Sequence, residues 1–140
     1  MKISIIYWSG TGNTETMAKL IAEGAQGAGA EVYISEIGKL DHPKSNESEI
    51  LVLGCPAMGA EVLEEDEFEP FIAHIEPKLT GRKIALFGSY GWGDGEWMRD
   101  WTARMQKAGA VLAAESLIVN EEPNGDDVQR CKDFGAAICK

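Results

Sequence analysis

Ile3-Ser4-Ile5-Ile6-Tyr7-Trp8, followed directly by Ser9-Gly10-Thr11-Gly12-Asn13-Thr14, carries the strongest evidence for the fold of this chain. The first six residues are mostly apolar and predict a strand, and a helical pattern follows the second six. A small polar loop between a strand and a helix N-terminus predicts an anion site, because backbone N–H groups point outwards and the helix dipole favours negative charge. The loop holds no Lys or Arg, so we expect it to bind a phosphate through neutral donors.

Strand and helix patterns alternate along the rest of the chain. Further strands are predicted at about 31–37, 49–54, 83–88 and 110–119, and helices at about 13–28, 68–75, 96–108 and 125–138. Asn13 or Thr14 is expected to cap the first helix. Continuous apolar strands between helices imply a parallel sheet covered on both faces. We therefore expect an α/β fold with three layers, as a single domain over residues 1–140.

Glycine is concentrated in the loops that follow the first, third and fourth predicted strands. These loops span residues 9–14, 54–61 and 88–95. In an open parallel sheet, ligands bind outside the carboxyl ends of the strands. The sequence therefore predicts one binding site at which the three loops meet.

The first loop differs from two commoner phosphate motifs. It is not a P-loop, because no Gly-Lys-Ser/Thr follows. Gly10 and Gly12 match the start of a dinucleotide fingerprint, but Glu15 stands where the third glycine belongs and would oppose a pyrophosphate. The hydroxyl and amide groups suit a terminal monophosphate instead, and an ordinary capped turn is the alternative. The candidate phosphate contacts are Ser9, Gly10, Thr11, Gly12, Asn13 and Thr14.

The third loop, Ser89-Tyr90-Gly91-Trp92-Gly93-Asp94-Gly95, places two aromatic residues among glycines. A core aromatic is unexpected there, so Trp92 and Tyr90 are predicted to contact a flat, conjugated ligand ring through offset stacking. Local packing of Trp92 is the alternative. Trp97 and Trp101 lie four residues apart on a predicted helix and are expected in the core.

The second loop offers further contacts to such a ring. Met58 is polarizable and can lie against an aromatic face, and Gly59 can take a positive φ, so that its peptide could rotate. Glu61 could accept a hydrogen bond from a ring N–H. Cys55 has no adjacent base and is predicted to be a small buried residue. The candidate ring contacts of both loops are Pro56, Ala57, Met58, Gly59, Ala60, Glu61, Ser89, Tyr90, Gly91, Trp92 and Gly93.

A monophosphate loop, two ring-facing residues and a flexible glycine together fit flavin mononucleotide (FMN). The motifs Ser9–Thr14, Gly54–Gly59 and Phe87–Asp94 resemble those of the short-chain flavodoxins of anaerobic bacteria. The similarity covers nearly the whole chain, including Glu67–Phe71 and Leu117–Asn120. It implies a flavodoxin-like fold with a five-stranded parallel sheet of order 2-1-3-4-5. It also implies a low-potential one-electron carrier, not an enzyme, whose FMN cycles mainly between semiquinone and hydroquinone.

The resemblance also implies individual roles. Trp92 would cover the outer face of the ring and Met58 would flank the inner face. The Gly59 carbonyl would accept a hydrogen bond from N5–H, Glu61 would face the pyrimidine edge, and Ser89–Gly91 would contact the ribityl chain and ring. Relatives often have Asp or Ser after the flipping glycine. This chain has Ala at position 60, so a polar contact from that side chain is absent.

The charge of the chain limits its partners. It carries 23 acidic and 13 basic residues, a net charge of −10, which disfavours nucleic acid and anionic membranes. The expected partners are basic-surfaced redox enzymes that also use ferredoxin-type carriers, and we expect a monomer. A dense acidic run at 61–69 is either a solvated helix start or a docking patch for such partners.

Three cysteines without a CxxC motif argue against a disulfide framework or a zinc site. They favour a reducing, cytoplasmic location. The chain begins directly with a strand, so no signal peptide is expected, and no apolar run is long enough for a membrane span. The isolated His42 and His74 are predicted at the surface.

Two other functions fit the alternating pattern less well. An FMN-dependent NAD(P)H reductase needs room over the flavin, which Trp92 should block, and the acidic surroundings should repel NADPH. A signalling receiver domain needs an aspartate after the third strand, where Gly54 and Cys55 stand. The electron carrier is therefore the leading hypothesis.

Overall fold

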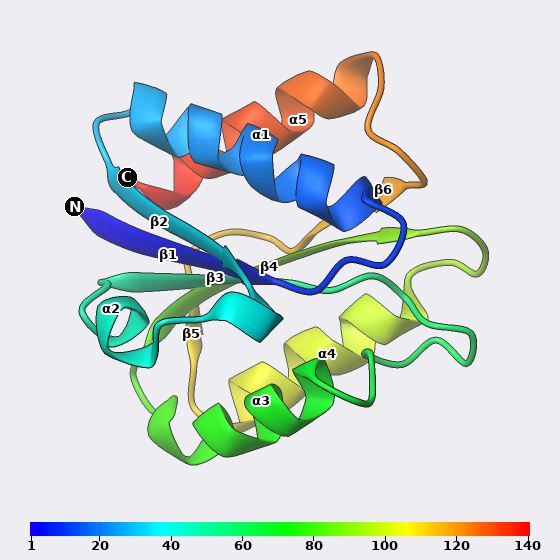
Figure 1. Cartoon of the computed structure of the whole chain (residues 1–140), viewed down its shortest axis with the longest axis horizontal. Coiled ribbons are helices and arrows are strands. Elements are labelled where there is room, and N and C mark those ends of the chain that lie inside the picture. The colour runs from blue at the N-terminus through cyan, green and yellow to red at the C-terminus, as the bar shows by residue number, and fades with distance from the viewer.

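The computed structural model describes all 140 residues and contains a parallel sheet between layers of helices (Figure 1). The strands are β1 (Lys2–Tyr7), β2 (Glu31–Glu36), β3 (Ile50–Gly54), β4 (Lys83–Tyr90), β5 (Val111–Leu112) and β6 (Leu117–Asn120). The helices are α1 (Asn13–Gly27), α2 (His42–Asn46), α3 (Phe68–Ile75), α4 (Glu96–Lys107) and α5 (Asp126–Ile138). The short α2 and the 3₁₀ turns Ile37–Lys39 and Glu76–Lys78 were not predicted.

The sheet has the order β2-β1-β3-β4-β5, with β6 also pairing with β4, and every pair is parallel. The predicted fold class and strand order are confirmed. The predicted strand at 110–119 is divided into two segments: β5 pairs with the start of β4, and β6 pairs with its end. Between the segments, Ser116 Oγ forms a hydrogen bond with Thr102 Oγ1 of α4 (2.8 Å), so a side chain of the helix holds this part of the chain.

Two apolar cores lie on opposite faces of the sheet. α1 and α5 cover one face, and α3 and α4 cover the other (Figure 1). Trp97 and Trp101 are buried in the second core, as their spacing predicted. The ring of Phe68 meets that of Trp101 edge-on, with centroids 5.5 Å apart, which is a favourable aromatic geometry.

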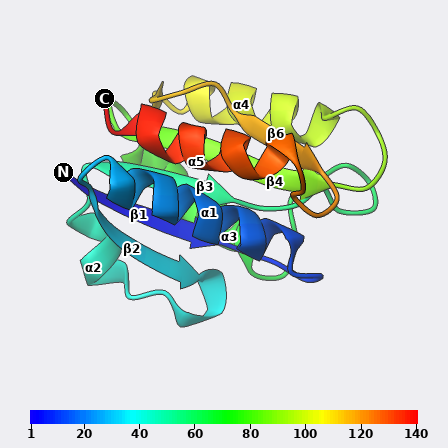
Figure 2. The same cartoon turned by 90° about the horizontal axis from the view of Figure 1, so that it is seen from above.

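Two glycines allow α1 and α5 to lie side by side above the strands (Figure 2). A Cβ atom at Gly24 would collide with the backbone oxygen of Lys132, and one at Gly135 would collide with that of Ile21. The backbones are therefore in direct contact, and this contact fixes the position of the helix that begins at the phosphate loop.

The remaining predictions about single residues can be compared with the structure directly. His42 and His74 are exposed. All three cysteines are free, with Cys55 and Cys131 buried. No helix has both the length and the apolar composition needed to cross a bilayer.

Candidate functional site

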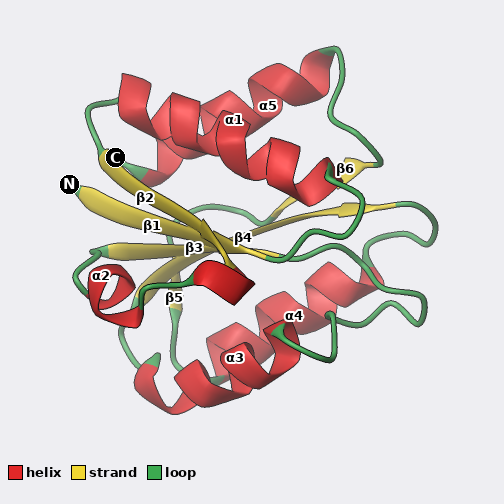
Figure 3. Cartoon of the chain, in the orientation of Figure 1, coloured by secondary structure: helices red, strands yellow, loops and turns green.

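The loops that follow β1, β3 and β4 reach the same end of the molecule (Figure 3). There they surround a cavity of about 530 Å³, within the usual size range of ligand pockets. Nine of the predicted contacts line it: Gly10, Thr11, Asn13, Pro56, Ala57, Met58, Ser89, Tyr90 and Gly91. The structure thus brings together one part of each loop. The predicted contacts outside this lining are Ser9, Gly12, Thr14, Gly59, Ala60, Glu61, Trp92 and Gly93.

The first loop is held by the side chain of Ser9. Its Oγ accepts hydrogen bonds from the N–H groups of Gly12 and Glu15, both at 3.2 Å. Helix α1 begins after Gly12, which has a φ of 99° and so favours glycine. The prediction that Asn13 or Thr14 caps the helix is wrong, since neither side chain forms a capping bond. The Ser9 hydroxyl provides this bond from outside the helix.

Five of the six N–H groups of this loop have no acceptor in the protein, because only that of Gly12 donates a hydrogen bond. Three of the five, those of Thr11, Asn13 and Thr14, lie at the start of α1. Free donors at a helix N-terminus, beside a cavity, are suited to bind an anion.

Thr14 connects the first loop to the third. Its hydroxyl forms a hydrogen bond with Ser89 Oγ (2.9 Å), and both residues are buried. The Thr14 side chain thus joins two loops that are far apart in the sequence.

The second loop contains a tight turn around Gly59 and Ala60. Met58 N donates to Val62 O (3.0 Å), and Glu61 N donates to Met58 O (2.8 Å). The positive φ falls on Glu61, at 51°, and not on Gly59. No atom lies within 4 Å of a Cβ placed on Gly59, so a side chain there would meet open space.

Both ends of the second loop are anchored at Cys55. Trp97 Nε1 donates to the Cys55 carbonyl (3.2 Å), and Glu64 N donates to Cys55 Sγ (3.4 Å). Burial raises the pKa of the Cys55 thiol to about 12. A neutral, buried thiol agrees with the prediction that Cys55 is not a nucleophile.

Glu61 has a carboxyl oxygen that no protein group satisfies. Its Oε1 is buried without a hydrogen-bond partner, and the side chain lies so close to Gly93 that a Cβ there would collide with it. Burial of the carboxyl, and then the adjacent Glu96, raise the pKa of Glu61. A buried acceptor without a donor is costly, so an N–H group of a ligand would stabilise it.

The acidic run at 61–69 is not a uniform solvated surface. Glu64 is buried and accepts hydrogen bonds from the N–H groups of Asp66, Glu67 and Phe68, at 2.7, 2.7 and 2.9 Å. Burial alone would raise the pKa of Glu64, but these three bonds lower it. Glu64 therefore caps the start of α3.

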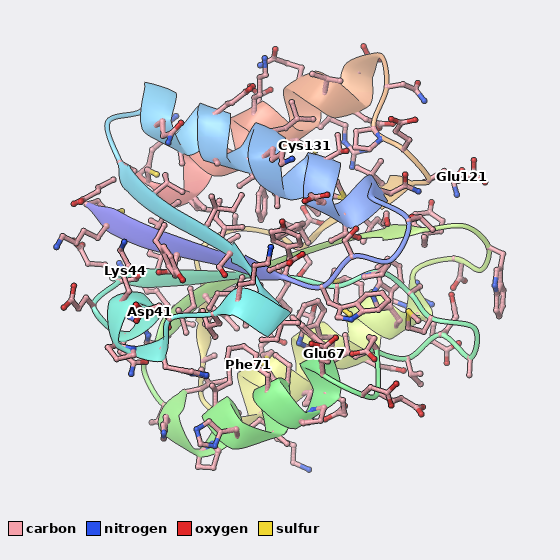
Figure 4. All side chains as sticks on the ribbon, viewed as in Figure 1. Asp41, Lys44, Glu67, Phe71, Glu121 and Cys131 are labelled. Carbon is pink, nitrogen blue, oxygen red and sulfur yellow. The ribbon has the colours of Figure 1, made fainter.

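Arg104 of α4 binds a second carboxylate of the run. It donates to both carboxyl oxygens of Glu69, at 2.6 and 2.7 Å, and to Glu76. The exposed acids of the run are Glu65, Asp66 and Glu67; Glu67 lies beside the start of α3 in Figure 4.

The two aromatic residues of the third loop differ. Tyr90 is the last residue of β4 and half-buried, with its ring centroid 5.7 Å from that of Trp97. The expectation that it lies outside the core is therefore wrong in part: it packs on a core residue and also lines the cavity. Trp92 is 62% exposed, as a residue without an internal packing partner would be.

Three residues of the cavity wall were missed by the sequence analysis. Trp8 follows β1, and its ring lies 3.0 Å from a Cβ placed on Gly10. Glu121 and Glu122 follow β6; Glu121 has a φ of 58°, and its N–H donates to Tyr90 O (2.8 Å). Glu121 lies at the same end of the molecule as the loops (Figure 4). Glu121 follows the last predicted strand, and this position at the carboxyl end of a parallel strand could have predicted that it lies near the site.

A larger groove, of about 640 Å³, lies between α4, β6 and the start of α5. Its two guanidinium groups already have partners: Arg99 pairs with Asp94 (2.8 Å), and Arg130 pairs with Asp127 (3.1 Å). Gly95 is the one residue of the three predicted loops that lines this groove. The smaller cavity therefore remains the candidate site.

Known proteins resemble this chain in sequence and in fold. A model of the flavodoxin family matches residues 5–135. The chain belongs to the flavodoxin family. It is 52% identical to the flavodoxin of Clostridium beijerinckii over 97% of this chain and 98% of that protein. The corresponding identity to the flavodoxin of Megasphaera elsdenii is 45%, over 99% and 98%. The solution structure of two-electron reduced Megasphaera elsdenii flavodoxin covers 97% of each chain, with a TM-score of 0.87 and 43% identity.

Family membership identifies the general activity. The chain is an FMN-based electron carrier, and flavodoxins bind FMN without a covalent bond. They are electron-transfer proteins and not enzymes, so the relatives do not favour an NAD(P)H reductase.

Proposed function

We propose that the chain carries single electrons at low potential, with its FMN phosphate bound at residues 9–14 and its ring between the second and third loops. The observation that carries this proposal is the set of free N–H groups at Thr11, Asn13 and Thr14 beside the cavity. They suit a terminal phosphate, because the helix dipole and the N–H donors act on the same anion.

The ring end of the cavity supports the same orientation. Met58 and Tyr90 line it, and the unpartnered Oε1 of Glu61 suits an N–H donor such as the flavin pyrimidine edge. Trp92 is 62% exposed at this end, and stacking on the ring would cover an aromatic surface that is otherwise in water. When bound, FMN supplies the redox chemistry, and the chain supplies orientation and charge.

Carboxylates near the ring support a low potential. Glu121 and Glu122 line the cavity, and no Lys or Arg does. A negative charge about 10 Å away opposes added negative charge by roughly 0.4 to 1.7 kcal/mol, for dielectric constants of about 80 and 20. Several such carboxylates therefore disfavour the most reduced, negatively charged flavin.

The proposed partners are basic-surfaced redox enzymes that also use ferredoxin-type carriers. The exposed acids Glu65, Asp66 and Glu67 support docking to a basic surface. We expect electron-transfer rates to fall as ionic strength rises, because salt screens charge complementarity. Rates that do not change with salt would contradict this docking mode.

We further propose that residues 1–140 act as one FMN-binding domain, as a cytoplasmic monomer.

Ligand binding to the apoprotein tests the site. We expect FMN to bind more tightly than riboflavin, because riboflavin lacks the phosphate. We expect FAD to bind weakly, because the loop lacks the third glycine of a dinucleotide fingerprint. Equal affinities for FMN and riboflavin would contradict the phosphate assignment. Rapid bleaching of the bound flavin by NADH or NADPH alone would favour a reductase instead.

A further inference from the structure

Glu15 occupies a position from which its carboxylate could block the phosphate loop. It is the third residue of α1, whose N-cap is Gly12. A Glu at this position commonly reaches back to the N–H of the N-cap residue. Such a bond would stabilise the helix, but it would place a negative charge among the donors that we assign to the phosphate.

The Glu15 side chain does not reach back in this structure. Its Oε2 accepts a hydrogen bond from the Tyr7 hydroxyl (3.1 Å) and lies 3.8 Å from Lys19 Nζ. The N–H group of Gly12 donates to Ser9 Oγ instead. The carboxylate is thus bound to a group on the sheet, while the loop retains its free donors.

Tyr7 is suited to hold a carboxylate in a fixed place. It is the last residue of β1 and only 6% exposed, so the sheet fixes its ring. Burial, and then the bond to Glu15, raise its pKa to about 12, so the phenol remains a donor at neutral pH. Lys19 is 67% exposed at its side chain, and an exposed ion pair of this kind holds its partner weakly.

We propose that the Tyr7 hydroxyl is a positioning group that keeps the Glu15 carboxylate out of the phosphate loop and so sets the preference of the site for FMN over riboflavin. The inference rests on the proposed function, because it takes residues 9–14 as the phosphate site. It assigns Tyr7 no contact with the ligand: Tyr7 acts through Glu15.

The test is the ratio of the apoprotein's affinities for FMN and riboflavin, measured by quenching of flavin fluorescence. Tyr7→Phe removes only the hydroxyl. We expect it to lower this ratio roughly three- to tenfold at low salt, the scale of a unit-charge repulsion near a protein surface. The decrease should become smaller at high salt, because the repulsion is screened.

Tyr33→Phe is the matched control. Tyr33 lies on β2, and its hydroxyl accepts a hydrogen bond from the N–H of Asp41 (2.9 Å); Asp41 lies beside α2, away from the three loops (Figure 4). This variant also loses one tyrosine hydroxyl, and its FMN-to-riboflavin ratio should match that of the unaltered protein.

The second change tests whether Tyr7 acts through Glu15. Adding Glu15→Gln to Tyr7→Phe should restore the ratio, because the released side chain no longer carries a charge. If Tyr7→Phe does not fold, Glu15→Gln alone decides. It should raise the ratio less than about threefold, since that carboxylate is already held away, whereas a rise of tenfold or more would overturn the proposal.

The outcomes separate this inference from the proposed function. Equal affinities for FMN and riboflavin in the unaltered protein would refute the phosphate site itself. A clear FMN preference that Tyr7→Phe leaves intact would refute the role of Tyr7 alone. A loss of affinity that is the same for both ligands would show that Tyr7 is merely structural, and would also overturn the inference.

Discussion

The two ends of the cavity are built from different parts of the polypeptide. At the proposed phosphate end, the free backbone N–H groups of Thr11, Asn13 and Thr14 are the expected donors, and the Ser9 hydroxyl and the start of α1 hold the loop in place. At the proposed ring end, the expected contacts are side chains: Met58 and Tyr90 from the cavity wall, and the Glu61 carboxyl and the exposed Trp92 indole from outside it. The first end includes the start of a packed helix, whereas the second lies mostly on loops.

This difference predicts different energetic behaviour. Backbone donors at the end of a packed helix cost little additional ordering on binding, because α1 is already fixed by its direct backbone contact with α5. The exposed Trp92 side chain must be ordered by the ligand. Changes at the phosphate end should therefore affect FMN but not riboflavin, and changes at the ring end should affect both.

The largest effect is expected from Gly135→Leu, which acts on the support of the phosphate end. Any Cβ at position 135 meets the backbone of Ile21 on α1. We expect the free energy of unfolding to fall by about 3 kcal/mol, the upper range for overpacking, as measured by urea denaturation. Gly27→Ala is the control, since its Cβ would meet no atom within 4 Å. Equal stability of the two variants would contradict the direct helix contact.

The next effect is expected from Trp92→Ala, which removes the exposed indole of the ring end. Loss of stacking should weaken the binding of FMN and riboflavin alike by roughly 1–3 kcal/mol, taking stacking on nucleobases as the guide. Trp92 has no internal packing partner at 62% exposure, so the stability of the apoprotein should not change. If only the affinity for FMN fell, Trp92 would act at the phosphate end, which would contradict its assignment to the ring end.

A smaller and selective effect is expected from Gly12→Ala. The φ of 99° at Gly12 strains any residue with a Cβ, by about 1–2 kcal/mol, although the Cβ itself has free space. The loop should relax and lose affinity for FMN, with riboflavin unaffected. Gly29→Ala is matched to it, with a φ of 94° and free space at the far end of α1. If both variants change the FMN-to-riboflavin ratio equally, the loop conformation is not responsible.

The smallest effect is a pH dependence at the ring end. The pKa of Glu61 is raised above its ordinary value of 4.5 by burial and by Glu96, so its protonated form persists to higher pH. A ligand N–H forms a stronger hydrogen bond with the ionised carboxylate than with the neutral acid, so riboflavin should bind more tightly as pH rises through this raised pKa. Riboflavin is used because it has no phosphate to titrate. Glu61→Gln should abolish the dependence, and its persistence in that variant would exclude Glu61 as the cause.

Local patterns in the sequence predicted the fold and much of the site. The spacing of Trp97 and Trp101 placed them in the core, and glycines marked the three loops that surround the cavity. The helical spacing and the glycine-rich loops can be predicted from the sequence, because each depends on residues a few positions apart. The division of the last strand was not predicted, because it involves a contact between Ser116 and Thr102 of α4.

Other errors have the same physical origin. Glu64 belongs to an acidic run, yet it is buried because its carboxylate accepts three backbone N–H bonds at the start of α3. Tyr90 stands among glycines, yet the pairing of β4 with β6 extends the strand to it. In both residues, bonds formed in the folded chain outweigh the local composition.

The order of strands, loops and helices follows from the amino-acid sequence alone, because hydrophobic periodicity and glycine position are local properties. A parallel sheet then requires its loops to meet at the carboxyl ends of the strands. Which polar atoms are satisfied and which are free depends instead on the packing of distant elements. Ser9 Oγ occupies two N–H groups and leaves others free, Thr14 bonds to Ser89, Tyr7 holds Glu15, and Glu61 retains an unpartnered oxygen. Hydrogen bonds depend on distances of tenths of an ångström between residues from different elements, and no local pattern encodes them.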